Sequence, residues 1–288
     1  MGERDDRRDG GAAPDTRPDP GNEPVRWERV EDLREEASGA VRRSRSAGAG
    51  SGRPPGRGAA DEGLGPRQRR GRDRRNPGAG TGGADAREEL VRALGAQKGG
   101  RANERLRDAA HAFERERFEE ARTLLRPIAE AAPGAASVRE LLGLTYYRLG
   151  RWRDAVKELE AFRELTGTVE QHPVLADCYR AEGHRGVVEE LWDELRDASP
   201  SADLVVEGRI VMAGTLADGG DLQPAISLLE RAHRSVKRPG VHHLRQAYAL
   251  ADLYERAGEV ARARELFRWV TLQEPDFADA AERTAALT

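Results

Sequence analysis

The side chains best suited to chemistry in this chain are its six histidines and its single cysteine. The histidines are His111, His172, His184, His233, His242 and His243. None of them has a second metal ligand at the spacing that a metal site requires, and the adjacent His242 and His243 should point to different helical faces. Cys178 lies beside two candidate core residues with no histidine next to it in sequence, so we predict a packed thiol rather than a nucleophile.

A glycine-rich string, Gly78 to Gly83, fits the GxGxxG pattern of a dinucleotide-binding loop. That loop works only between a strand and a helix, where the glycines let the backbone approach a pyrophosphate. The preceding residues Arg74 to Pro77 do not read as a strand, so a flexible linker is the better interpretation. Carboxylate pairs such as Glu119-Glu120 are typical of solvated helix faces in a chain with 34% charged residues. The sequence therefore predicts no catalytic residue, no cofactor and no enzyme activity.

A basic cluster precedes this string. It consists of Arg67, Arg69, Arg70, Arg72, Arg74 and Arg75. Residues 41–80 carry eleven arginines against three carboxylates, a net charge of +8, and no aromatic ring that could stack on a base. Contact with nucleic acid through this cluster would be electrostatic and weakly selective. The alternative is codon usage: 45 arginines against 3 lysines, with abundant glycine, alanine and proline, suggest the GC-rich genome of a bacterium.

Composition divides the chain near residues 85–100. Of fourteen aromatic residues only Trp27 lies in the first hundred, and so little apolar material cannot offset an ordering entropy of about 1–2 kcal/mol per residue. We expect a disordered tail over 1–84, a short helix capped by Asp85 with a linker to residue 100, and a folded body over 101–288. A narrow apolar stripe in residues 25–43 leaves open a transient helix or a partner-docking helix.

After a break at Gly99-Gly100 the apolar pattern predicts pairs of helices, and no segment alternates with the period of a strand. The first helices are expected near 103–114, 137–149, 171–182, 204–218 and 241–256. Their partners are expected near 117–131, 152–165, 185–197, 222–235 and 260–272, with a capping helix near 276–286.

Four of the five predicted hairpins share one short pattern. Gly150, Gly183, Gly220 and Gly258 are followed five residues later by Ala155, Val188, Ala225 and Ala263. Glycine suits the left-handed turn that ends a helix, and a small side chain lets two helix axes approach to roughly 8–10 Å. With Ala121 the small positions are 34, 33, 37 and 38 residues apart, so stacking should be less regular in the last repeats.

This pattern resembles the tetratricopeptide repeat (TPR), a helix-turn-helix unit of about 34 residues. The residues that match in the second pair are Leu142, Gly143, Tyr146, Gly150, Trp152, Ala155 and Leu159. The resemblance spans residues 102–287. It implies an all-α fold, an α-solenoid of about five TPR-like repeats preceded by a long disordered N-terminal tail.

In the family that the chain resembles, the first helices line a concave groove that receives a segment of another protein. The groove residues that this implies here are Phe113, Tyr147, Arg148, Arg180, Arg245, Tyr248, Glu255 and Arg256. The alternative for Phe113 and Tyr147 is that they cover the next helix pair.

These observations predict a non-enzymatic adaptor or scaffold that binds another protein in this groove. The alternative is a nucleic-acid- or ribosome-associated protein tethered by the basic tail 41–80, with the repeats as a spacer. A third reading has the basic tail folding onto the acidic body. One cysteine forms no internal disulfide, and no apolar window approaches the roughly 18 residues of a membrane span, so we expect a soluble cytoplasmic protein without membrane contact.

Overall fold

The computed structural model describes residues 83–198, 200–233 and 239–287, and this part of the chain contains twelve helices and no strand. The first helices of the five pairs are α3 (Ala96–Glu114), α5 (Ala136–Arg148), α7 (His172–Ala181), α9 (Ala202–Asp218) and α11 (Val241–Arg256). The second helices are α4 (Phe118–Ala131), α6 (Trp152–Thr166), α8 (Arg185–Ala198), α10 (Leu222–Glu230) and α12 (Val260–Gln273). α2 (Gly83–Leu94) precedes them and α13 (Ala280–Ala286) follows. The predicted pairs and the capping helix are confirmed.

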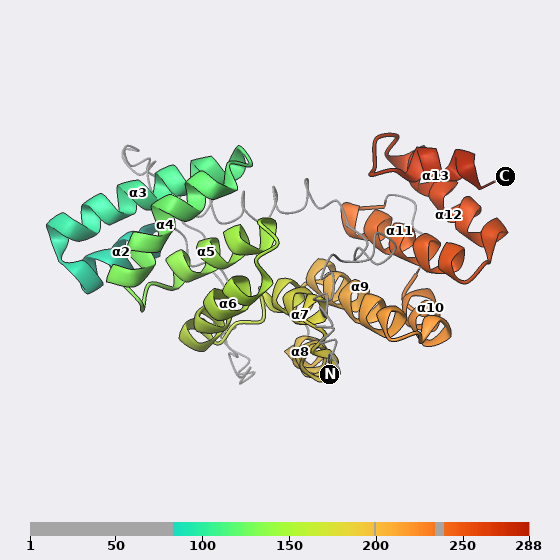
Figure 1. The fold of residues 1–288 in the computed structure, drawn as a ribbon, viewed down its shortest axis with the longest axis horizontal. Coiled ribbons are helices and arrows are strands. Elements are labelled where there is room, and N and C mark those ends of the chain that lie inside the picture. Colours follow the sequence, from blue (N-terminus) through green and yellow to red (C-terminus); the bar gives the residue numbers. More distant parts are fainter. Residues whose placement is uncertain (1–82, 199, 234–238, 288) are drawn as a thin grey trace, which may run out of the picture.

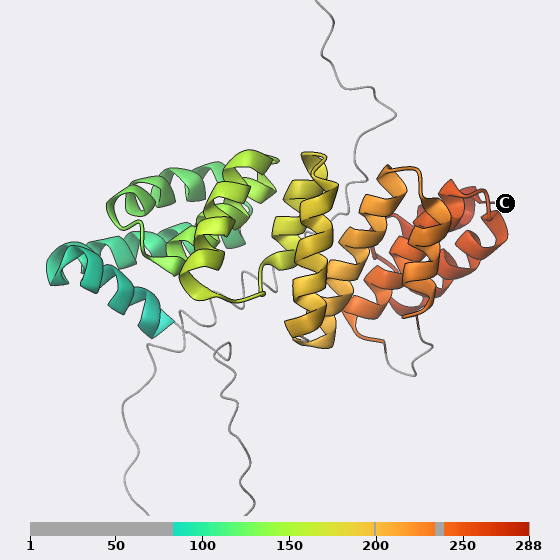
Figure 2. The ribbon, with the colours of Figure 1, turned by 90° about the horizontal axis from the view of Figure 1, so that it is seen from below.

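The hairpins stack in chain order, so the all-α solenoid is confirmed. Each helix packs mainly against its neighbours in sequence, and contacts between successive first helices join the repeats. Figure 1 shows the helices following an arc, with α5, α7, α9 and α11 on its inner side and α6, α8 and α10 along its outer edge. Figure 2 shows the same hairpins side by side along the long axis.

The predicted glycines end the first helices as expected. Gly150, Gly183, Gly220 and Gly258 have φ angles of 67°, 77°, 88° and 77°, in the left-handed region. In each turn the next residue donates its backbone N–H to a carbonyl of the preceding helix; Arg151 N, for example, lies 2.9 Å from Tyr146 O. The first repeat uses Glu116 instead, at φ 60°, with Arg117 N 2.9 Å from Ala112 O. The same turn therefore forms without a glycine to mark it.

The small residues lie where the helices touch. Ala121, Ala155, Val188, Ala225 and Ala263 are all fully buried. On the opposing helix of the second pair, a Cβ added to Gly143 would lie 2.7 Å from the side chain of Leu159. Close approach of the two helices therefore depends on small side chains from both, as the repeat pattern predicted.

Three boundaries differ from the prediction. α3 begins at Ala96, so Gly99 and Gly100 lie inside a helix and do not separate a linker from the body. Gly99 is there because α2 packs directly on it, as described below. α2 begins at Gly83, two residues before the predicted cap Asp85, and α10 ends at Glu230 rather than near 235. The predicted tail, its helix at 25–43, the arginine cluster and most of the glycine-rich string lie outside the described residues.

Candidate functional site

The inner sides of α5, α7, α9 and α11 form the surface where the sequence placed a binding groove. We call it the inner-helix surface and define it by the side chains that join one inner helix to the next. They are Tyr147, Asp177, Arg180, Glu207, Asp218, Arg245 and Arg256.

The link from α5 to α7 is a tyrosine. Tyr147 is buried, and its hydroxyl donates a hydrogen bond to Asp177 Oδ2 over 2.7 Å. Its ring packs edge-on against Trp152, with centroids 5.4 Å apart. The residue therefore belongs to the core between two repeats, and only its polar end reaches the next inner helix.

The link from α7 to α9 is an arginine between two carboxylates. Arg180 donates to Asp218 Oδ2 at 2.6 Å and to Asp177 Oδ1 at 3.1 Å, and only 7% of its side chain is exposed. Its guanidinium lies over Gly214, where an added Cβ would come within 2.9 Å of Arg180 Cζ. Burial acts to lower the pKa of Arg180, but the charges of Asp177 and Asp218 and their hydrogen bonds raise it, so the side chain stays charged.

Two more arginines join α9 to α11. Arg245 donates to Glu207 Oε1 over 2.7 Å, with both side chains less than one-fifth exposed. Arg256 donates to the backbone oxygen of Ala217 over 3.2 Å and lies 3.9 Å from Asp218. About one-third of the Arg256 side chain is exposed, so this residue contacts α9 and remains accessible to solvent.

The last inner helix is covered by α13. Arg283 donates to Asp252 Oδ1 over 2.8 Å and to Glu255 Oε2 over 2.6 Å, while Tyr248 donates to Asp279 Oδ1 over 2.5 Å. Burial raises the pKa of Asp252, and Arg283 opposes that rise. Within the described residues, Asp252 Oδ2 has no hydrogen-bond partner.

The eight predicted groove residues separate into two kinds. Phe113 and Tyr147 are buried, which favours the alternative that they cover neighbouring helices, and Tyr248 is buried as well. Of the charged residues, Arg180, Arg245 and Arg256 make polar contacts between inner helices, whereas Arg148 lies over the Phe118 ring of α4 and Glu255 accepts from Arg283 of α13. The surface is therefore more charged and less aromatic than the sequence predicted.

Glu207, Asp279 and Arg283 were not predicted as part of this surface. A signal for one of them was present, because Arg180 and Asp218 are 38 residues apart and so are Glu207 and Arg245. That separation equals the longest step between the small packing residues. Pairs of opposite charge one repeat apart on first helices therefore predict such links.

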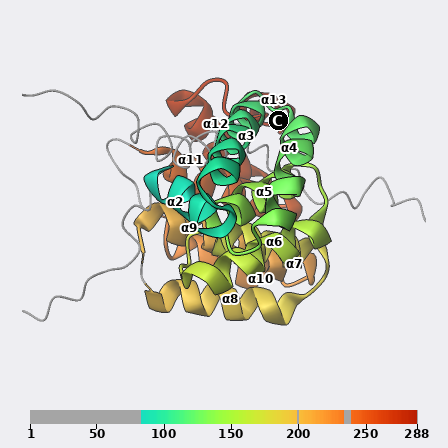
Figure 3. The ribbon, with the colours of Figure 1, turned by 90° about the vertical axis from the view of Figure 1, so that its left-hand side faces the viewer.

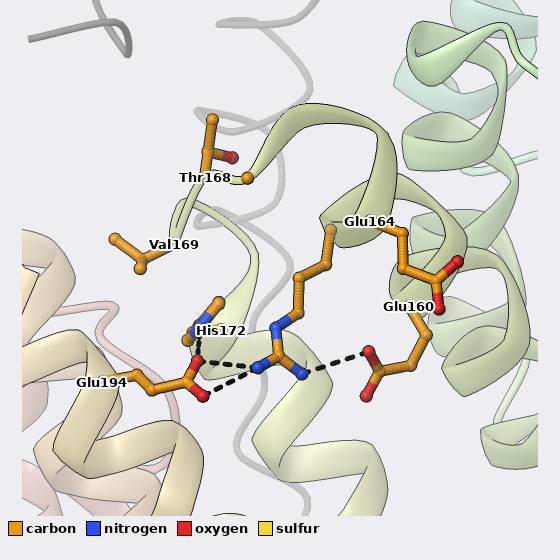
Figure 4. Close-up of a pocket in the computed structure, with 8 residues that line it drawn as sticks. Glu160, Glu164, Thr168, Val169, His172 and Glu194 are labelled. Atoms are coloured by element: carbon orange, nitrogen blue, oxygen red, sulfur yellow. Dashed lines mark hydrogen bonds and ion pairs between the residues drawn. The ribbon is translucent and has the colours of Figure 1, made fainter.

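A second candidate site is a pocket of about 300 Å³ where the α6–α7 loop meets α8 (Figure 4). Its polar residues form a chain: His172 Nε2 lies 2.9 Å from Glu194 Oε2, Arg163 donates to both oxygens of Glu194 at 2.8 Å, and Arg163 also donates to Glu160. Burial lowers the pKa of His172, so it is neutral at pH 7. Burial acts to raise the pKa of Glu194, but the His172 hydrogen bond and Arg163 lower it, so it is charged.

The other chemistry-bearing residues fit structural roles. Cys178 is fully buried, as predicted. The prediction that His242 and His243 point apart is wrong, since their ring centroids are 3.9 Å apart. His242 pairs with Asp203, and His243 Nδ1 accepts the backbone N–H of Gly240, which turns both rings to the start of α11. Across the described ranges no three side chains are grouped to hold a metal ion, and none of the helices there is long and apolar enough to cross a bilayer.

Comparisons with known proteins bear on the fold. No protein-family model matches the chain, and no curated protein sequence matches it. Among solved structures it is similar to a thermophilic TPR protein of Thermus thermophilus, with a TM-score of 0.51 and 20% sequence identity. The match covers 65% of this chain and 98% of that one. The chain therefore has the fold that the repeat pattern predicted.

Proposed function

We propose that this TPR-type solenoid is a non-enzymatic adaptor in the cytoplasm, and that it binds a segment of another protein along the inner-helix surface. The observation that carries the proposal is the row of cross-links on that surface. Tyr147–Asp177, Arg180–Asp218 and Glu207–Arg245 join four inner helices in sequence. Side chains that are already ordered lose less conformational entropy when a partner binds.

The exposed charged groups on α11 indicate what kind of segment would bind. Arg245 and Arg256 of this surface, and the neighbouring Glu255, are partly exposed and lie within about three turns on α11. Both signs of charge are present, so we expect a segment with alternating charged residues that add to the existing pairs. The buried rings of Tyr147 and Tyr248 support the surface from beneath and do not contact the partner directly in this proposal.

The test is selection of peptides from a displayed library on the full chain, followed by charge reversal. Arg245→Glu with Arg256→Glu should weaken the selected peptides about tenfold or more, because like charges placed together at an interface are repulsive. Arg264→Glu, on the exposed face of α12, is the matched control and should change affinity little. Equal effects of the inner and outer reversals would contradict the proposal.

The alternative function is favoured by one observation, the net charge of +8 over residues 41–80. A nucleic-acid tether would be retained on RNA or DNA at low salt and released as salt rises. Deleting residues 41–80 would then abolish retention. Retention that survives the deletion would exclude the arginine cluster as the tether.

A further inference from the structure

In the described part of the chain, the position of α2 differs from that of the second helices of the five pairs. α2 packs against α3, which follows it, and also against α5, which is the first helix of the next pair. Each of α4, α6 and α8 packs against the first helix that follows it but makes no comparable contact with the first helix of the pair after that. α4 also packs against both α3 and α5. Figure 3, an end-on view, shows α2 and α4 on opposite sides of α3. α2 therefore covers the face of α3 that lies opposite α4, and it reaches α5.

The fit between α2 and α3 is close and depends on a glycine. A Cβ added to Gly99 would lie 2.6 Å from both Leu90 O and Val91 Cα, which are backbone atoms of α2. Leu90 is fully buried at this contact. Ala86, about one turn before Leu90 on α2, is also buried.

α2 also supplies a polar group that α5 lacks. α5 begins after Ala135, which has no capping side chain, and its first turn contains no acidic residue. Glu89 Oε2 of α2 accepts hydrogen bonds from Ser137 N at 3.3 Å and from Ser137 Oγ at 3.2 Å. The first backbone N–H groups of a helix have no partner within the helix, and a carboxylate there is favourable. Glu89 therefore acts as a borrowed N-terminal cap.

From this arrangement we infer that the face of α3 and α5 opposite α4 is a binding surface for an amphipathic helix, and that α2 fills it as an internal ligand. The partner segment that competes for it is a helix with the pattern of α2. That pattern is a small residue and a leucine four apart, as in Ala86 and Leu90, with a glutamate in the place of Glu89. This inference rests on the proposed function and specifies the partner's chemistry at the N-terminal end of the solenoid.

The construction of α2 suits an exchangeable ligand. It has twelve residues, and an isolated helix of that length is marginal in water. Among residues 86–94 of α2, whose side chains the structure describes, only Ala86 and Leu90 are buried. A single residue, Gly95, joins it to α3 with a φ of 79°, which glycine adopts without strain. A tethered ligand competes at an effective concentration in the millimolar range, so a free helix enters only when α2 is weakened.

The experiment uses the full chain and a fluorescein-labelled peptide of residues 83–94. Leu90→Glu removes the internal ligand's buried side chain but leaves the surface intact. The peptide should bind this variant at least tenfold more tightly than the native chain. Adding Gly99→Ala should abolish binding, because a Cβ there meets the peptide backbone. Adding Gly100→Ala is the matched control and should leave binding unchanged, since that site has nothing within 4 Å.

A peptide with Glu89 replaced by Gln should bind several-fold more weakly, because it loses the charge at the start of α5. If the Leu90→Glu chain loses helicity by circular dichroism, Glu88→Pro is the second variant, since it breaks α2 at an exposed position. No peptide binding to either variant would overturn the inference and make α2 a purely structural cap.

This outcome is separable from the proposed function, because the probe is the chain's own segment. Binding of the peptide without any effect of Arg245→Glu and Arg256→Glu on selected library peptides would contradict the adaptor surface on α11 but not the inference. Loss of library binding on those reversals, with no binding of residues 83–94, would contradict only the inference.

Discussion

Arg180 Nε lies 2.6 Å from Asp218 Oδ2, and this pair joins inner helices α7 and α9 across one repeat. The guanidinium is almost fully buried, while the carboxylate of Asp218 is about half exposed. Gly214 leaves the space through which the side chain passes. Arg180 therefore packs against Gly214 of α9 and also neutralises two carboxylates, Asp177 and Asp218.

Replacing Arg180 with Met should lower the free energy of unfolding by about 2–4 kcal/mol, because the mostly buried Asp177 loses the charge of Arg180. Urea denaturation followed by circular dichroism measures the change. Arg185→Met is the matched control, since Arg185 pairs with Asp221 between the same repeats but is exposed. It should have little effect. Equal losses for the two variants would show that burial of the pair is not what matters.

Ala263→Arg should destabilise the chain by several kcal/mol, because the site is fully buried and a long charged side chain would be forced between helices. Ala261→Arg, two residues earlier on the exposed face of α12, is the control and should be nearly neutral. Melting temperatures of both variants provide the measurement. An unchanged melting temperature for Ala263→Arg would contradict the assigned packing face.

The repeat could be predicted from the sequence because its signals are local and recur. Glycine in the left-handed turn and a small residue five positions later depend on only one hairpin, so Gly150 and Ala155 suffice to place both helices. The turn at Glu116 carries no such signal, yet the periodicity of neighbouring repeats still located it.

The candidate site was less predictable, because it depends on contacts between helices. Tyr147 and Tyr248 are typical of binding surfaces by residue type, but their burial is decided by the next repeat. The same holds for Gly99, which looks like a break in sequence and becomes a contact with Leu90 only once α2 folds back. The distance between repeats, not local propensity, decides these roles.

Acidification should destabilise the second and third repeats. The pKa of His172 is lowered below its ordinary value of 6.5 by burial, so the folded state binds fewer protons than the unfolded state. The stabilising effect is therefore complete above about pH 6.5 and is lost as the pH falls below that value. The pKa values of His233 and His243 are also lowered by burial, so they act in the same direction.

Thermal unfolding between pH 7.5 and 5.5 tests this expectation. The native chain should lose melting temperature across that range, and His172→Gln should reduce the slope. Glu194, whose pKa is lowered despite burial, contributes only at more acidic pH, below about 4.5. A slope identical in the native chain and His172→Gln would assign the effect to the other histidines.

The two buried tyrosines separate stability from binding. Tyr147→Phe with Tyr248→Phe removes the hydrogen bonds to Asp177 and Asp279 but keeps the rings, and should cost about 1–3 kcal/mol in total. Tyr147→Ala with Tyr248→Ala should cost much more, because it also leaves cavities. Library peptides selected on the native chain should bind the phenylalanine variant with nearly unchanged affinity. A large loss of affinity in that stable variant would place the hydroxyls in direct contact with the partner.

Arg283→Ala should release α13 without unfolding the first repeats. Arg283 is held by Asp252 and Glu255, and its guanidinium lies 4.3 Å from the Phe267 ring centroid. Removing it leaves the buried carboxylate of Asp252 without the Arg283 cation, a change expected to cost about 2–4 kcal/mol locally. Because each repeat contacts mainly its neighbours, the loss should stay near the C-terminal end.

Hydrogen exchange resolved along the chain is the measurement. Amide exchange should accelerate in α13 and α12, while α3 and α5 keep their native rates. Arg262→Ala is the control: Arg262 pairs with Glu230 and Glu259 on the outer side and is exposed, so its loss should leave α13 protected. Acceleration that reaches α3 and α5 would mean that the solenoid unfolds as one cooperative unit, because only then could loss of a contact at α13 open the far end.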